Sequence, residues 1–242
     1  MRKGISALLF VLILAASHAA QVKPATNVDV IPDVVYGHKD GMALTFDVLK
    51  PKTNSNGAAV IFIVSGGWVS RYTPPDEAVP RYQPLLDKGF TVIMLRHGGS
   101  PKYLIPEIVS DVRRGVRFIR YRAKGWGIDP NRLGVWGWSA GGHLALMIGL
   151  ASDNGDPTAK EDFMKESDRV QAVVAYFPPV DLRPIVRGLN PPPTGGVLDN
   201  YPALNFEKEK AATYSPIAFV TSDDPPTLLI HGDKDDLVPI SN

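Results

Sequence analysis

The chain has 242 residues, of which 44% are hydrophobic and 21% are charged, values that fit one globular domain or at most two small ones. Lysine and arginine total 26 against 25 for aspartate and glutamate, so the charge gives no reason to expect nucleic acid or an acidic membrane surface as a partner. The absence of cysteine excludes disulfides, thiolate metal sites and a cysteine nucleophile.

The first residues have the pattern of a secretory signal. Residues 1–3 are positively charged, residues 5–16 are almost entirely apolar, and small residues stand at the positions that a signal peptidase recognises before Ala20. The apolar run is shorter than the roughly 20 residues that span a bilayer, which disfavours the alternative of an uncleaved anchor. We therefore predict a signal peptide at 1–19, cleavage after Ala19, and a periplasmic or secreted domain over 20–242 without stable membrane insertion.

Two strands joined by a short turn open the predicted fold. Residues 28–36 and 42–49 have strand composition, and Asp40-Gly41 between them is a hairpin signal because glycine tolerates a positive φ. Apolar runs typical of strands buried on both faces follow at residues 58–64, 90–95, 132–136, 170–177 and 227–230. Helices are predicted at 107–124, with Pro106 in the first turn, and at 142–150. This alternation indicates an α/β fold with a mainly parallel sheet.

The helix at 107–124 carries a basic face. Arg113, Arg117, Arg120 and Lys124 recur at helical spacing, and we interpret them as a solvated face because the chain is nearly neutral. The acidic residues within 153–162 are likewise interpreted as a solvated loop, and no metal site is predicted there.

Residues 137–141, Gly-Trp-Ser-Ala-Gly, fit the G-x-S-x-G pattern of a nucleophile elbow. A predicted strand precedes the pattern and a predicted helix follows it, which is the context that such an elbow requires. Ser139 is therefore the expected nucleophile. The alternative is a glycine-rich packing turn.

Acyl transfer to a serine also needs hydrogen-bond donors for the developing oxyanion. The N–H of Ala140 would supply one donor. Gly66 and Gly67, which follow the strand at 58–64, place backbone N–H groups where a second donor is needed.

An acidic residue is expected after the serine in chain order. Residues 231–239 follow the last predicted strand and contain three aspartates. We select Asp235 by its position in the loop, to orient a histidine and stabilise its imidazolium. Asp181, which follows the strand at 170–177, is the reserve candidate.

From about residue 35 to its end, the chain resembles the α/β-hydrolase superfamily, in particular the esterase/lipase group with its acetylxylan- and feruloyl-esterase-like proteins. The motifs that carry the resemblance are Gly66-Gly67-Trp68, Asp129-Pro130-Asn131-Arg132, residues 137–143, Ser215-Pro216-Ile217 and residues 231–239. The resemblance implies an eight-stranded, mostly parallel sheet and hydrolysis of carboxylic esters by a serine–histidine–aspartate triad without a cofactor. It assigns Ser139 as nucleophile, Asp235 as acid, and Gly66, Gly67 and Ala140 as the oxyanion region. One departure is that Val64-Ser65 stands where the family has His-Gly, which leaves open which loop residue donates the second hydrogen bond.

The resemblance places the catalytic histidine some tens of residues after the acid, beyond one more strand. We therefore expect it beyond residue 242, together with the last strand and helix of the sheet, and a hydrophobic edge at 227–230. His143 and His231 are expected to be structural. His97 follows the strand at 90–95, and we expect it to bond nearby backbone, with a substrate contact as the alternative.

Trp68, Trp138 and Tyr103 either line a pocket for an aromatic or sugar group or belong to the core and its rim. The loop at 190–196 is either a small lid or a surface excursion. The predicted function is a serine carboxylic-ester hydrolase, acting through an acyl-enzyme on a short-chain or carbohydrate-linked ester, with no cofactor or metal. The alternatives are a non-catalytic hydrolase-like binding protein and a serine peptidase of the prolyl-oligopeptidase type.

Overall fold

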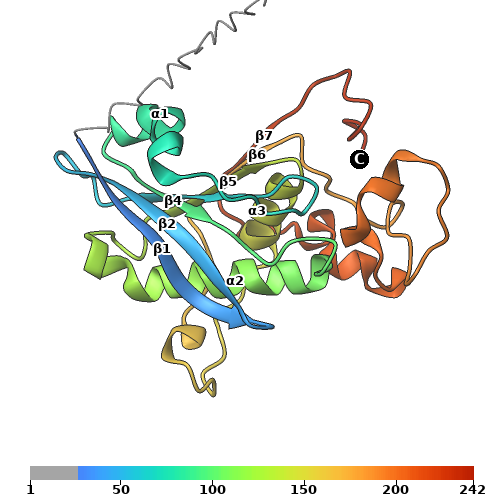
Figure 1. Cartoon of the computed structure of the whole chain (residues 1–242), viewed down its shortest axis with the longest axis horizontal. Helices are drawn as coiled ribbons and strands as arrows, with labels where there is room; N and C mark the ends of the chain where they lie inside the picture. Colours follow the sequence, from blue (N-terminus) through green and yellow to red (C-terminus); the bar gives the residue numbers. More distant parts are fainter. Residues whose placement is uncertain (1–26) are drawn as a thin grey trace, which may run out of the picture.

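The computed structural model describes residues 27–242, so the predicted signal peptide lies outside the described residues. A seven-stranded sheet with the order β1-β2-β4-β3-β5-β6-β7 forms its centre (Figure 1). The strands are β1 (Val28–Lys39), β2 (Met42–Pro51), β3 (Ala59–Ile63), β4 (Thr91–Leu95), β5 (Leu133–Trp138), β6 (Ala172–Tyr176) and β7 (Thr227–Ile230). β1, β2 and β4 pair antiparallel, and all pairs from β4 to β7 are parallel. The predicted fold class is confirmed.

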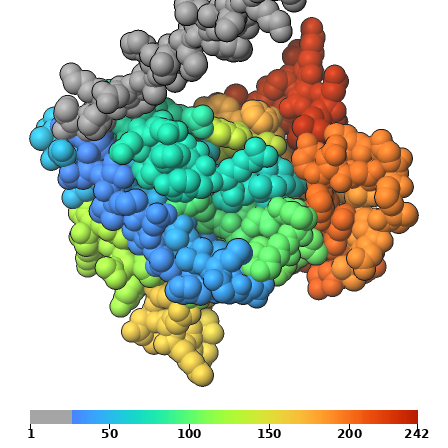
Figure 2. Space-filling model, viewed as in Figure 1, coloured from blue at the N-terminus to red at the C-terminus, as the bar shows by residue number. Residues whose placement is uncertain are grey.

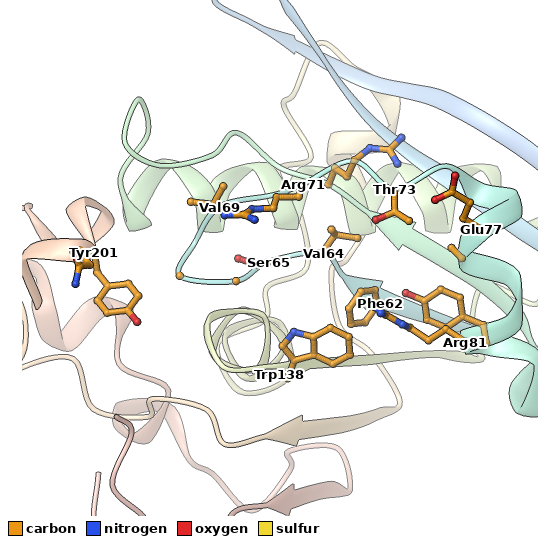
Figure 3. A pocket seen from close by; sticks show the side chains of 16 residues that line it. Phe62, Val64, Ser65, Val69, Arg71, Thr73, Glu77, Arg81, Trp138 and Tyr201 are labelled. Carbon is orange, nitrogen blue, oxygen red and sulfur yellow. The ribbon is translucent and has the colours of Figure 1, made fainter. Parts of the chain in front are cut away.

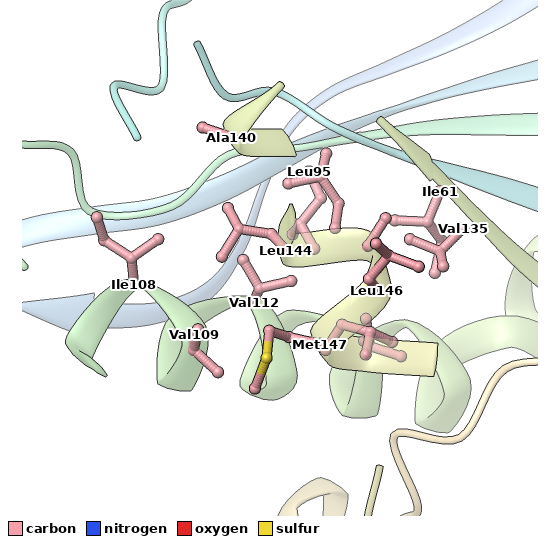
Figure 4. Packing of buried hydrophobic residues seen from close by; sticks show 14 of the residues in the cluster. Ile61, Leu95, Ile108, Val109, Val112, Val135, Ala140, Leu144, Leu146 and Met147 are labelled. Carbon is pink, nitrogen blue, oxygen red and sulfur yellow. The ribbon is translucent and has the colours of Figure 1, made fainter. Parts of the chain in front are cut away.

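Within residues 27–242, three α-helices cover the two faces of the sheet: α1 (Pro75–Leu86), α2 (Ile105–Arg122) and α3 (Ala140–Leu150). Alternate residues of the central strands point to opposite faces, as the period of a strand requires. Ile61 and Leu95 belong to the core with α2 and α3, where Leu144 and Val112 meet them (Figure 4). A second core lies under α1 on the other face and contains Phe62.

Helix α1 was not predicted from the sequence, because Pro80 and Pro84 stand inside it and read as helix breakers. Pro75 occupies the first turn, where a missing N–H costs nothing. Val79 and Tyr82 are buried at helical spacing against the sheet. Burial of this face therefore overrides the weak local preference for a helix.

The turn between β1 and β2 has the predicted geometry. Lys39 pairs with Met42, which leaves Asp40 and Gly41 as a two-residue loop. Both loop residues have positive φ, at 48° and 79°, as the type I′ hairpin turn requires. This hairpin fixes the register of the antiparallel edge.

The prediction of a solvated arginine face on α2 is wrong. Arg117 and Arg120 are 6% and 9% exposed. Arg113 donates to the fully buried Asp168 at 2.8 Å, and Arg117 pairs with Asp153. The segment between α3 and β6 folds back across the helix and supplies these carboxylates, so the acidic loop is also not simply solvated. Nothing in either local sequence indicated that the two segments meet.

Strand β7 forms one edge of the sheet and is exposed along its whole length. Leu228 and Leu229 point to opposite faces and are 54% and 56% exposed. The hydrophobic edge predicted at residues 227–230 is thus present. None of the helices in residues 27–242 has the length and apolar character of a membrane span.

Candidate active site

Ser139 lies in the turn between β5 and α3, the position that the pattern predicts. Its backbone is strained, with φ 51° and ψ −125°, and such conformations cost about 1–3 kcal/mol. The Ser139 N–H donates to the carbonyl of Tyr176 at 2.9 Å, and its carbonyl accepts from the His143 N–H at 2.9 Å. Bonds to β6 and to the next turn of α3 therefore hold the strained serine in place.

The two glycines that flank Ser139 are required by close backbone contacts. A Cβ on Gly137 would lie 2.4 Å from the carbonyl carbon and oxygen of Gly141. A Cβ on Gly141 would lie 2.8 Å from the carbonyl oxygen of Ile63. Real Cβ atoms essentially never approach that closely. Only glycine at both positions lets the turn pack this closely against β3 and α3, which is the physical reason for their spacing.

The backbone donors around Ser139 differ in availability. Ala140 is the first residue of α3, and the N–H groups of a first helical turn have no partner within the helix. The Gly66 N–H donates to the Val69 carbonyl at 3.0 Å and is therefore engaged. Gly67 has a φ of 57° and lines a cavity together with Ser139, and in the described part of the chain no hydrogen bond uses its N–H.

Two cavities meet beside the elbow. Ser139 opens into the smaller one, of about 70 Å³, which is lined mostly by apolar side chains from the segments around Ile185, Leu198 and Leu237. The larger one, of about 640 Å³, extends from the loop after β3 towards α1 (Figure 3). Gly67 and Tyr201 border both cavities.

The wall containing Tyr201 comes from the long segment between β6 and β7. This segment forms a bulge, coloured orange, beside the loop that follows β3 (Figure 2). Ile185, Leu198 and Leu204 of the bulge line the small cavity, whereas residues 190–196 line neither cavity. The proline-rich loop is thus a surface excursion whose flanking segments cover the site.

Asp235 lies in the loop after β7, next to the small cavity. Its Oδ1 accepts from the N–H groups of Leu237 and Val238 at 3.0 and 2.9 Å, and its Oδ2 is 3.7 Å from His231 Nε2. Val238 and Pro239 line the cavity of Ser139, but the Asp235 side chain does not. The structure therefore brings the loop, rather than the carboxylate itself, to the serine.

The reserve acid, Asp181, follows β6. The hydrogen bond from Arg183, at 2.8 Å, lowers the pKa of the Asp181 carboxyl group. Like Asp235, Asp181 does not line the small cavity, although Pro179 nearby does.

His143 is a buried structural residue of α3. Its Nδ1 accepts from Trp68 Nε1 at 3.2 Å, so Nε2 carries the proton and donates to the Tyr214 carbonyl at 2.8 Å. Burial lowers the pKa of His143 to about 4, which keeps the ring neutral. One imidazole thus joins the loop after β3, helix α3 and the segment before β7.

His97 is also buried, at 6% exposure, and its Nδ1 bonds the Gly98 carbonyl at 2.8 Å. Burial lowers its pKa to about 4. His97 lines neither cavity beside Ser139. Its position is that of a loop histidine bonded to nearby backbone.

The three aromatic candidates separate into different environments. Trp68 lines the small cavity, Trp138 lines the large one, and Tyr103 is a core residue whose hydroxyl donates to Asp40. Ser65 and Tyr201 also border the cavities, although neither was predicted as a site residue. The Val64-Ser65 departure was the only signal for Ser65, and no sequence signal pointed to Tyr201. Among residues 27–242 there is no cluster of three histidines, aspartates or glutamates that could hold a metal ion.

A mostly parallel sheet with a strained serine between β5 and the following helix is the architecture of the α/β-hydrolases. Comparison with family models agrees with this architecture. The chain belongs to the BD-FAE family, whose model matches residues 46–242.

Two similar curated proteins are named as ester hydrolases. The probable carboxylic ester hydrolase LipM of Mycobacterium tuberculosis is 28% identical over 86% of this chain and 48% of its own length. Esterase LipQ of the same organism is 30% identical over 75% of this chain and 43% of its own length. The present chain thus spans about half the length of these relatives. The solved structure of a truncated carbohydrate esterase from gut microbiota matches with a TM-score of 0.68 at 27% identity, covering 89% of this chain and 81% of that one.

Proposed function

We propose that the protein is a serine carboxylic-ester hydrolase that acts through an acyl-enzyme formed on Ser139. The observation that carries the proposal is the strained elbow, which presents Ser139 to a cavity that Gly67 also lines. The names of two relatives, the probable carboxylic ester hydrolase LipM and esterase LipQ, support the same reaction.

In this proposal Ser139 Oγ attacks the ester carbonyl carbon, and the carbonyl oxygen becomes an oxyanion. The N–H groups of Ala140 and Gly67 donate to that oxyanion, while Gly66 holds the loop through its bond to Val69. A general base takes the Ser139 hydroxyl proton and gives it to the alcohol oxygen as the ester C–O bond breaks, and water then hydrolyses the acyl-enzyme. The small cavity beside Ser139, about 70 Å³, suits a short acyl group such as acetyl, which leaves the larger cavity for the alcohol.

A serine hydroxyl needs a general base to become an effective nucleophile. Each ring nitrogen of His143 is occupied, His97 lines neither cavity, and His231 Nε2 bonds the Val238 carbonyl. We propose that Asp235 is the acid and that the base is a histidine from outside these 242 residues, which Asp235 would orient.

The test is hydrolysis of 4-nitrophenyl acetate by the chain and by a Ser139→Ala variant, with and without added imidazole as a substitute base. We expect turnover that requires Ser139 and rises at least about tenfold with imidazole, because general bases typically contribute 10²–10⁴-fold. Labelling by a fluorophosphonate with mass spectrometry of the peptide would place the covalent adduct on Ser139.

Two results would contradict parts of the proposal. Equal turnover by Ser139→Ala, with no label on Ser139, would remove the serine mechanism and favour a non-catalytic binding protein. Turnover that requires Ser139 but gains nothing from imidazole would contradict the proposal that the base lies outside these 242 residues.

A further inference from the structure

The larger cavity beside the elbow is rich in cationic side chains. Arg71, Arg81 and Arg96 line it, and Glu77 is the one carboxylate among its lining residues (Figure 3). The side chains reach the cavity from the loop directly after β4, from α1 and from the loop before α1.

Arg96 is balanced. It pairs with Asp47, which is fully buried, and with Asp33 at 3.1 Å. In contrast, Arg71 and Arg81 form no ion pair with any carboxylate in the described residues, and the Arg81 guanidinium lies 5.5 Å from the ring centre of Trp138. Arg81 also hydrogen-bonds the Tyr82 side chain, a neutral group that leaves its charge unbalanced. With one carboxylate, Glu77, against two guanidinium groups that lack an ion pair, the cavity keeps an excess positive charge.

A second, independent feature of the same cavity is the hydroxyl of Ser65. Ser65 is only 5% exposed and lines the cavity, yet its Oγ has no hydrogen-bond partner in residues 27–242. A buried hydroxyl without a partner is destabilising, and a ligand oxygen that bonds it removes this cost. Ser65 directly precedes Gly66 and Gly67, so a group bound to it lies close to the proposed ester carbonyl.

We propose that the larger cavity binds the alcohol part of the ester and that this alcohol carries a carboxylate, as uronate sugars do. Arg71 and Arg81 at the cavity mouth attract the carboxylate, and the Ser65 hydroxyl donates to or accepts from an oxygen of the same alcohol. Phe62 and Trp138 supply apolar surface for a ring. This inference rests on the proposed ester hydrolysis and names the substrate class of that reaction.

The test compares two acetyl esters that differ in one charge, 3-acetoxybenzoate and its neutral methyl ester, methyl 3-acetoxybenzoate. The measured quantity is the ratio of their kcat/KM values in the wild type and in variants, so the intrinsic reactivity of each ester cancels. Arg81→Gln should lower this ratio about fivefold at low salt, the size expected for an exposed charge pair, and Arg71→Gln should act in the same direction. Added salt should lower the wild-type ratio, because exposed charges are screened.

Arg122→Gln is the matched control, since it removes one arginine at the exposed end of α2, outside both cavities, and should leave the ratio unchanged. An equal ratio in the wild type, Arg71→Gln and Arg81→Gln would overturn the inference while leaving ester hydrolysis intact.

A binding measurement keeps the inference testable if neither ester is hydrolysed. Calorimetry with the Ser139→Ala protein should show tighter binding of 3-hydroxybenzoate than of 3-hydroxybenzamide, and Arg81→Gln should remove the difference. Loss of hydrolysis together with a retained binding preference would contradict the proposed reaction alone. Equal binding of the two compounds would overturn the inference itself.

Discussion

The turn at Ser139 and the loop at Asp235 are held in the protein by different means. Around Ser139, ten of the eleven residues of α3 are buried, and the flanking glycines touch backbone on both sides. Around Asp235, the preceding strand β7 is exposed at all four positions. Hydrogen bonds between Asp235, Val238 and His231 hold the loop, and Asn242 joins its end to Val180 and Asp181.

The two regions thus illustrate two ways in which a protein holds a side chain in position, by packing and by a few hydrogen bonds. Packing holds Ser139, the proposed nucleophile, so a rigid core maintains its strained backbone. A few hydrogen bonds hold the loop of Asp235, the proposed acid, at the sheet edge, where local opening costs less free energy. We therefore expect substitutions at the elbow to change the free energy of unfolding much more than substitutions in the acid loop.

The largest effect is expected from Gly137→Ala. Its Cβ would lie 2.4 Å from the Gly141 backbone, so the turn must move, and we expect a loss of about 3 kcal/mol in the free energy of unfolding. Gly134→Ala in the same strand is the matched control, because its Cβ meets nothing nearer than 3.6 Å. Urea unfolding of both variants provides the measurement. Similar losses for both would show that close packing does not set the elbow apart.

A second effect, which is smaller than that of Gly137→Ala over any single pH unit, concerns stability at low pH. The pKa of His143 is about 4 in the folded protein against an ordinary value of 6.5, so between these pH values the unfolded chain binds a proton that the folded chain does not. The free energy of unfolding should therefore fall as the pH drops from 6.5 towards 4, by up to about 1.4 kcal/mol per pH unit from this group. His143→Gln should reduce this slope in urea unfolding measured at several pH values.

His97, whose pKa is lowered in the same direction, contributes to the slope in both proteins and does not affect the comparison. His38→Gln is the matched control, since His38 is exposed on β1, and we expect the wild-type slope from it. An unchanged slope in His143→Gln would contradict the assignment of a neutral, buried imidazole.

The smallest change in stability is expected from Asp235→Asn. The amide oxygen can still accept from Leu237 and Val238, so the free energy of unfolding should change by less than about 1 kcal/mol. The Ser139-dependent rate in imidazole should nevertheless fall if Asp235 is the acid, whereas Asp236→Asn, one residue further in the exposed loop, should leave the rate unchanged. A loss of stability as large as that of Gly137→Ala would remove the contrast between the two regions.

The local sequence pattern was sufficient to predict much of the fold. Composition correctly predicted the strand at residues 227–230, and turn chemistry correctly predicted the turn at Asp40-Gly41. The Ser139 elbow was also predictable, because its glycine spacing is imposed by contacts within five neighbouring residues and the strand beside them.

The remaining features depend on contacts between distant segments. The partners of Arg113 and Arg117 come from a loop about 40 residues away, and Tyr201 reaches the site from the segment between β6 and β7. Ser65 is notable only because folding leaves its hydroxyl buried without a partner. Helix α1 depends on burial against the sheet rather than on its proline-rich local sequence.

Tyr201 lines both cavities, and its ring lies so near Gly67 that a Cβ at that position would be 3.0 Å from the ring. A single side chain therefore takes part in selecting both halves of the proposed ester. Directed evolution towards longer acyl groups would reach this position early, and each substitution there would also reshape the preference for the alcohol. In the proposed reaction, selectivity for the acyl group and selectivity for the alcohol would thus be coupled through this one ring.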